Sequence, residues 1–132
     1  MTAPPPRPRR PNPRSELAQI GESLAAATLQ QQGFRIEALN LRTRDGEIDL
    51  LVRKGGLWVA VEVKTRRHDQ APERAVREEQ RLRITRALAA LGAVLRPRPK
   101  RMRVDVVAVR IRPDRSHDLL HFPGREFDPP PC

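Results

Sequence analysis

A pair of glycines between two strand-like runs is the feature of this sequence that most constrains the fold. Residues 46–53 and 57–64 are rich in valine, leucine and isoleucine, and Lys54, Gly55 and Gly56 separate them. Gly-Gly supplies the positive φ angles that tight turns need, so the two runs are predicted to form a β-hairpin. With Gly55 and Gly56 in the turn, the numbers of opposed residues sum to 111. A four-residue loop with the same centre keeps this pairing, whereas a three-residue loop shifts it.

This pairing predicts a hairpin with one apolar face and one charged face, because side chains alternate along a strand. Asp49 is placed opposite Glu62, and Glu47 opposite Lys64. The other face carries only apolar side chains, namely Ile48, Leu50, Val52, Val59, Val61 and Val63. Directly opposed carboxylates repel each other, so a strand pair selected only for stability would avoid Asp49 against Glu62. The charged face is therefore a candidate functional site.

A divalent cation would remove this repulsion. Mg²⁺ (or Mn²⁺) typically takes one or two carboxylates together with waters and phosphate oxygens, and Asp49 and Glu62 are the expected ligands. Lys64, one pleat along, could position an attacking water or neutralise charge on a phosphate. Glu22 could add an oxygen ligand, directly or through water. The alternative interpretation is an ordinary solvated sheet face with a Glu47–Lys64 ion pair.

The remaining segments predict two helices and further strands around this hairpin. Residues 15–33 begin with Ser15, a good N-cap, and end at Gly33, and Glu22 lies in a helical stripe with Ala18, Ala25 and Leu29. Residues 72–95 predict a second helix from the spacing of Ile84, Leu88, Leu91 and Leu95. Strands are expected at 34–41, at 103–111 and around 119–122. The fold class is therefore α/β, with a central mixed sheet flanked by two helices.

The positive charge of the chain is concentrated beside the hairpin. The formal net charge is +10, of which residues 66–101 carry +7, residues 1–14 carry +4 and residues 34–65 only +1. Such an excess favours an acidic partner such as nucleic acid. The candidate phosphate-binding side chains are Arg44, Arg66, Arg67, Arg74, Arg77 and Arg81. A solvated helix face in an arginine-rich protein explains the helical ones equally well.

Several classes of protein are excluded by simple counts. The longest apolar run, residues 87–95, is far shorter than the roughly twenty residues that span a bilayer. The N-terminal arginines and prolines are not followed by an apolar stretch, so no secretory signal is predicted and the cytoplasm is the expected location. Cys132 is the only cysteine, which excludes a disulfide framework. Aromatic residues make up 3% of the chain, which argues against modules that stack successive bases.

Two motifs resemble a known family. R-D-G-E-I-D-L-L (Arg44 to Leu51) and V-E-V-K-T-R (Val61 to Arg66), with R-V-D-V-V (Arg103 to Val107), are similar to the YraN family of small bacterial proteins. The resemblance implies a restriction-endonuclease-like fold, similar also to Holliday-junction resolvases. Asp49, Glu62 and Lys64 match the D and E-x-K residues of that superfamily, and Glu22 matches its first-helix acid.

These observations predict three parts of the chain: a disordered Pro/Arg-rich arm at 1–14, a nuclease-like domain at 15–122 and a C-terminal tail at 123–132. The expected function is Mg²⁺-dependent endonuclease activity on DNA, branched or structured DNA included. The partner is nucleic acid, with no membrane association, and a homodimer is one possible assembly. One alternative is a nucleic-acid-binding protein that keeps the fold without catalysis. Another is a structural partner protein whose charge only confers solubility.

Overall fold

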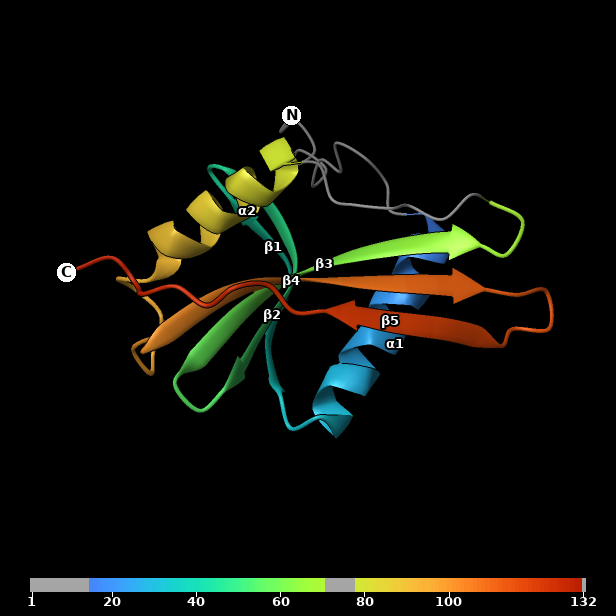
Figure 1. The fold of residues 1–132 in the computed structure, drawn as a ribbon, viewed down its shortest axis with the longest axis horizontal. Coiled ribbons are helices and arrows are strands. Elements are labelled where there is room, and N and C mark those ends of the chain that lie inside the picture. Colours follow the sequence, from blue (N-terminus) through green and yellow to red (C-terminus); the bar gives the residue numbers. More distant parts are fainter. Residues whose placement is uncertain (1–14, 71–77, 132) are drawn as a thin grey trace, which may run out of the picture.

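The order of helices and strands follows the sequence expectation. The computed structural model describes residues 15–70 and 78–131. Their elements are α1 (Glu16–Gln31), β1 (Arg35–Thr43), β2 (Gly46–Lys54), β3 (Leu57–Arg67), α2 (Glu78–Leu91), β4 (Arg101–Ile111) and β5 (His117–Phe122). The five strands form one sheet in the order β1-β2-β3-β4-β5, in which only β3 and β4 run parallel (Figure 1). The predicted α/β class with a mixed sheet and two flanking helices is confirmed.

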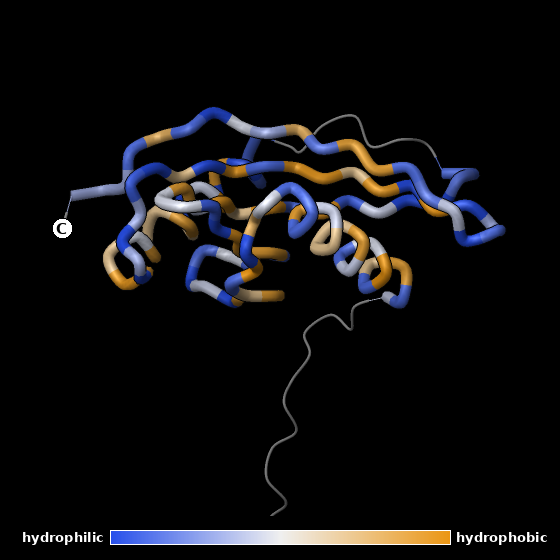
Figure 2. Tube along the Cα trace, turned by 90° about the horizontal axis from the view of Figure 1, so that it is seen from below, coloured by the Kyte–Doolittle hydropathy of each residue, from blue (hydrophilic) through white to orange (hydrophobic). Residues whose placement is uncertain are grey.

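The two helices cover opposite faces of the sheet and divide the core into two layers. Beneath α1 the buried residues include Ala25, Leu29, Leu50, Val59 and Val107. Beneath α2 they include Trp58, Ala60, Ile84, Leu88 and Met102. Apolar colour follows the middle of the strands and hydrophilic colour marks the turns in Figure 2, as expected for a sheet buried on both faces.

Helix α1 begins and ends where the sequence indicates. The Ser15 side chain accepts a hydrogen bond from the Ala18 amide at 3.0 Å, which satisfies one of the unpaired amides of the first turn. At the other end Gly33 adopts a φ of +96°, a conformation that favours glycine. The predicted stripe is also correct, because Glu22, Ala25 and Leu29 are buried against the sheet.

Helix α2 is shorter than predicted at its C-terminal end. It stops at Leu91, just before Gly92, and not at the predicted Leu95. Leu95 nevertheless packs against the core beneath α2. The predicted start at Pro72 lies outside the described residues, as do the N-terminal arm at 1–14, Arg74, Arg77 and Cys132.

The hairpin pairs as predicted near its turn but not along its whole length. The β2–β3 ladder runs from Lys54↔Leu57 to Leu50↔Val61, which confirms the predicted register. Beyond Leu50, β2 leaves β3 and stays paired only with β1, as far as Thr43↔Gly46. The predicted pairing of Glu47 with Lys64 is therefore wrong.

Two side chains lie on a different face of the sheet from the one that alternation predicts, one in β2 and one in β1. Alternation predicts Ile48 on the face of Leu50, but Ile48 packs beneath α2, and β2 leaves β3 between these two residues while it stays paired with β1. In β1, a register irregularity between Ile36 and Ala38 places these side chains in different core layers, whereas simple alternation predicts one face.

The segment after β5 returns to the sheet. Phe127 and Met102 form an antiparallel bridge, with reciprocal backbone hydrogen bonds of 2.8 and 2.9 Å. Gly124 lies so close to β4 that a Cβ atom there would be 2.0 Å from the Val104 carbonyl oxygen. In the described part of the chain, no helix has the length and apolar character needed to cross a membrane.

Candidate functional site

The centre of the candidate site is the point where β2 and β3 part. Asp49 is the first β2 residue beyond the β2–β3 ladder, and its Oδ2 accepts a hydrogen bond from the Val63 amide at 2.9 Å. The carboxylate thus takes a backbone donor that a continued ladder would have satisfied. Asp49 and Glu62 are 9% and 8% exposed, so two carboxyl groups are buried at this fork.

The two carboxyl groups influence each other strongly. Burial, and next the nearby Asp49 carboxylate, raise the pKa of Glu62 from 4.5 to about 7, while Lys64 acts in the opposite direction. A hydrogen bond between the two carboxyl groups also favours the protonated form of Glu62. Near neutral pH Glu62 is therefore partly protonated, at a place where a cation could bind instead.

Lys64 and a residue from α2 complete the polar cluster. Lys64 Nζ lies 3.2 Å from Glu62 Oε1 and donates to Gln80 Oε1 at 3.3 Å. Gln80 Nε2 donates to the same Glu62 oxygen at 2.8 Å. Gln80 is not among the site residues predicted from the sequence, because its contacts with Glu62 and Lys64 depend on how α2 docks on β3.

Glu22 is positioned by a close helix–strand contact. Its neighbour Gly21 packs so tightly on β3 that a Cβ atom would lie 1.9 Å from Thr65 Oγ1. Glu22 is 8% exposed and lines a groove of about 740 Å³ between α1 and the β1–β2 pair, which Glu47 also lines. Glu47 therefore lies toward the groove under α1 and not beside Lys64.

The oxygen donors fit a hard divalent cation. Asp49 and Glu62 supply two carboxylates, and Mg²⁺ commonly binds with one or two of them plus waters. Within residues 15–70 and 78–131, no three or more His, Cys, Asp or Glu side chains form a group that could hold a metal ion. The fit consequently rests on the buried, proton-sharing pair, and the role of Glu22 as a third ligand stays a prediction.

Four of the predicted arginines lie among the described residues, on one strand, one turn and one helix of the fold. Arg66 lies half-buried on β3, Arg67 is exposed at the end of β3, Arg81 is exposed on α2 and Arg44 is exposed in the β1–β2 turn. Arg66 and Lys64 both line a second cavity of about 510 Å³. Phosphate binding by these side chains stays a prediction.

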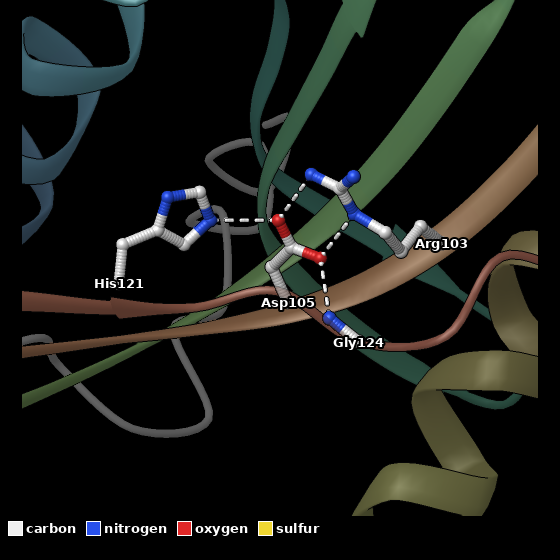
Figure 3. Close-up of polar contacts among 4 residues, drawn as sticks. All are labelled: Arg103, Asp105, His121 and Gly124. Atoms are coloured by element: carbon white, nitrogen blue, oxygen red, sulfur yellow. Dashed lines mark hydrogen bonds and ion pairs between the residues drawn. The ribbon is translucent and has the colours of Figure 1, made fainter.

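A second buried acid, Asp105, lies elsewhere in the sheet. It is fully buried and accepts two hydrogen bonds from the Arg103 guanidinium, at 2.7 and 2.9 Å (Figure 3). His121 Nε2 lies 2.7 Å from Oδ2, and the Gly124 amide donates to Oδ1 at 3.0 Å. Asp105 stands alone in a valine-rich strand of the sequence, which predicts a buried acid satisfied by a neighbour such as Arg103 or by a backbone amide, with a role in the site as the alternative. Arg103 and the Gly124 amide are both partners in the structure. The cluster joins β4 to β5 and the following segment.

Fold and site together define a class of protein. A five-stranded mixed sheet flanked by two helices, with an acid pair and a lysine where two central strands part, is consistent with a restriction-endonuclease-like core. The model of the uncharacterised protein family UPF0102 matches residues 21–109, and the chain belongs to this family, to which the YraN resemblance pointed.

Three relatives carry the name UPF0102 protein. One from Chloroflexus aurantiacus is 40% identical over 111 residues, covering 84% of this chain and 92% of the relative. One from Symbiobacterium thermophilum is 42% identical over 100 residues, covering 74% and 85%. One from Leifsonia xyli is 36% identical over 113 residues, covering 84% and 96%. The similarity thus spans most of each protein.

Proposed function

We propose that this protein is a Mg²⁺-dependent (or Mn²⁺-dependent) endonuclease that hydrolyses phosphodiester bonds in DNA, including branched or structured DNA. The observation that carries the proposal is the buried Asp49–Glu62 pair with Lys64 Nζ 3.2 Å from Glu62. Two buried acids that share a proton are costly for stability, and a cation site gives them a function.

Each side chain has a separate role in this chemistry. Asp49 and Glu62 would hold the cation, which supplies Lewis-acid stabilisation of the phosphate when bound. Lys64 orients the attacking water and offsets negative charge that develops on the phosphate. Gln80 is a positioning residue, because it donates to Glu62 and accepts from Lys64. Glu22 supports the site from α1 through a water or a direct contact.

The charge distribution supports a nucleic-acid substrate. The net charge is +10, and Arg66 follows Lys64 on the same strand. Lysine and arginine side chains around an acidic centre attract the phosphate backbone while leaving sequence unread. An enzyme acting on chromosomal DNA would work in the cytoplasm of a bacterium. Cutting both strands of a duplex would need two such sites, which a homodimer provides.

One observation favours a second candidate, a nucleic-acid-binding protein without catalysis. Among the described residues, no buried side-chain nitrogen or oxygen lacks a hydrogen-bond partner. The network of Glu62, Lys64 and Gln80 is therefore satisfied without a cation. A protein that only binds nucleic acid could retain this network as a structural element.

Cleavage assays separate the two candidates. The full chain is incubated with branched, duplex and single-stranded DNA in Mg²⁺, Mn²⁺ or EDTA, beside Asp49→Asn, Glu62→Gln and Lys64→Met. Catalysis predicts cation-dependent cutting that each variant lowers by about 10²-fold or more. The exposed residues Asp45 and Lys100 give the control variants Asp45→Asn and Lys100→Met, which should cut normally. Binding without cutting in every cation, and equal binding by the variants, would favour the second candidate.

A further inference from the structure

The face of the sheet that carries Glu62 and Lys64 continues across β4 to the edge strand β5. The registers define three rows: Glu62–Val106–Phe122, Lys64–Ala108–Leu120 and Arg66–Arg110–Asp118. Paired residues of neighbouring strands point to the same face, so all nine side chains lie on one side. In Figure 1, α1 passes behind this part of β3, β4 and β5, and α2 lies over the other end of the sheet.

A cavity of about 510 Å³ lies over these rows, and its two sides differ in chemistry. Lys64, Arg66 and Arg110 line it with three positive charges, and Asp118, which forms an ion pair with Arg112, lines it with one negative charge. Leu120 and Phe122 line it toward the sheet edge with apolar surface, and they are 61% and 53% exposed. Ala108 lies between the two sides, and its small side chain leaves the middle of the face low.

Phe122 differs from the other aromatic residues of the chain. Of the three phenylalanines and one tryptophan, Trp58 and Phe34 are buried and Phe127 is partly buried. Phe122 and Leu120 together form an exposed apolar surface that does not contribute to the core, and such surfaces often mark binding sites. An aromatic ring beside cationic side chains suits a nucleotide, which has a flat base and an anionic phosphate.

We infer that this cavity is a subsite for an unpaired nucleotide, whose base stacks on Phe122 and whose phosphates contact Arg66 and Arg110. Two strand spacings separate the Glu62 row position from Phe122, roughly 10 Å along the sheet. A strand leaving the acid pair past Lys64 therefore enters the cavity directly. This inference rests on the proposed function, and it adds that the substrate has a single-stranded segment beside the bond to be cut. One aromatic serves one base, in keeping with the few aromatic residues of the chain.

Binding measured without cleavage tests the subsite separately from catalysis. Fluorescence anisotropy of a labelled twelve-nucleotide oligo-dT strand in EDTA gives the Kd of the full chain. Phe122→Ala should raise this Kd about 5- to 150-fold, the range measured for loss of one base–aromatic stack. Phe122→Leu should bind as weakly, because it is apolar but cannot stack, and Phe122→Trp should bind as the wild type does. Val94→Ala, at a site 68% exposed after α2, is the control and should leave the Kd unchanged.

The phosphate contact has its own readout in salt. Arg110→Ala should lower the slope of log Kd against log salt by about 0.7, the value for one phosphate of a single strand. Arg110→Lys should keep the slope. Arg35→Ala, whose side chain is 74% exposed on the opposite edge strand, is the matched control and should also keep it.

A photocrosslink locates the base directly. Irradiating a strand that carries 5-iodouracil should attach it to Phe122, as read by mass spectrometry of the digested complex. Wild-type affinity in Phe122→Leu would overturn the inference. So would a loss of self-association in Phe122→Ala without a change in Kd, because the face would then bind a second copy of the chain. If Phe122→Ala binds and cleaves DNA as the wild type does, the subsite inference is overturned and the proposed catalysis is not. If the wild type binds the strand through Phe122 but cleaves no DNA in any cation, the proposed catalysis is overturned.

Discussion

The sheet contains two sets of buried carboxyl groups with opposite surroundings. Asp105 is fully buried and has several hydrogen-bond partners. The Arg103 guanidinium lies at 2.7 and 2.9 Å, His121 at 2.7 Å and the Gly124 amide at 3.0 Å. Asp49 and Glu62 are nearly as buried, yet each has the other carboxyl group as a close neighbour. Both sets lie on central strands of one sheet.

The difference is one of charge balance. Arg103 supplies a full positive charge to the single carboxylate of Asp105, so the cluster needs nothing from outside. At the fork, Lys64 is the cation in contact with Glu62, and burial together with Asp49 still raises the pKa of Glu62 to about 7. Protonation of Glu62, or a bound divalent cation, would lower the repulsion between its carboxyl group and that of Asp49. The Asp105 cluster is explained by stability, and the Asp49–Glu62 pair fits the proposed function.

The largest expected change in the free energy of unfolding comes from breaking the Asp105 cluster. Asp105→Ala leaves the Arg103 guanidinium, 14% exposed, without its carboxylate, and should lower the free energy of unfolding by about 3–5 kcal/mol. Urea denaturation followed by the fluorescence of the single tryptophan, the buried Trp58, measures it. Asp118→Ala, which removes the partner of Arg112 at the surface, is the control and should be nearly neutral. Equal losses in the two variants would contradict the structural role of Asp105.

Neutralising Glu62 in the Asp49–Glu62 pair should raise the free energy of unfolding, whereas Asp105→Ala lowers it. The folded-state pKa of Glu62 is raised from 4.5 to about 7, so its contribution favours folding at low pH and is lost as the pH rises through that window. Without divalent cations, Glu62→Gln should therefore unfold with a free energy higher than the wild type at pH 8, on the order of 2 kcal/mol. At pH 4.5 the two should be nearly equal. A difference that does not change with pH would count against the proton-sharing pair.

The sequence predicts the local parts of this comparison well. Gly55 and Gly56 fix the hairpin register, and the ladder from Lys54↔Leu57 to Leu50↔Val61 confirms it. Arg103 and Asp105 are two residues apart on one strand, so their contact follows from alternation alone. The burial of Glu22 follows from its helical stripe. Each of these features depends on neighbours within a few residues or on a single turn.

Features that depend on a choice between partners could not be predicted. Beyond Leu50, β2 can pair with either neighbour, and it keeps β1 and leaves β3, which moves Glu47 away from Lys64. His121 reaches Asp105 only through the register of β5 against β4. Gln80 joins the site only because α2 docks over β3. Long-range packing decides all three, and hydrophobic periodicity does not record it.

A divalent cation should distinguish the two acid clusters by ligand linkage. Mg²⁺ at ten times its Kd should raise the free energy of unfolding of the wild type by about 1.4 kcal/mol at pH 8. Asp49→Asn and Glu62→Gln should lose this gain, because each lacks one of the two carboxylates. Asp105→Asn should retain it, from whatever baseline stability it has. Thermal unfolding across a Mg²⁺ titration measures the shift, and an equal shift in all variants would place the cation elsewhere.

The smallest expected change in the free energy of unfolding concerns Gln80, which links the Asp49–Glu62 pair to α2. Gln80→Ala removes the hydrogen bond to Glu62 at 2.8 Å and the weaker one from Lys64 at 3.3 Å, and should cost about 1 kcal/mol in urea denaturation. The loss is smaller than for Asp105→Ala because no charge is left without a partner. Gln70→Ala, whose amide oxygen accepts from the Arg67 amide on the surface, controls for the loss of a side-chain amide. If Gln80→Ala lowered the free energy of unfolding as much as Asp105→Ala does, Gln80 would be important mainly for stability. The Asp49–Glu62 pair would then resemble the Asp105 cluster more than a cation site.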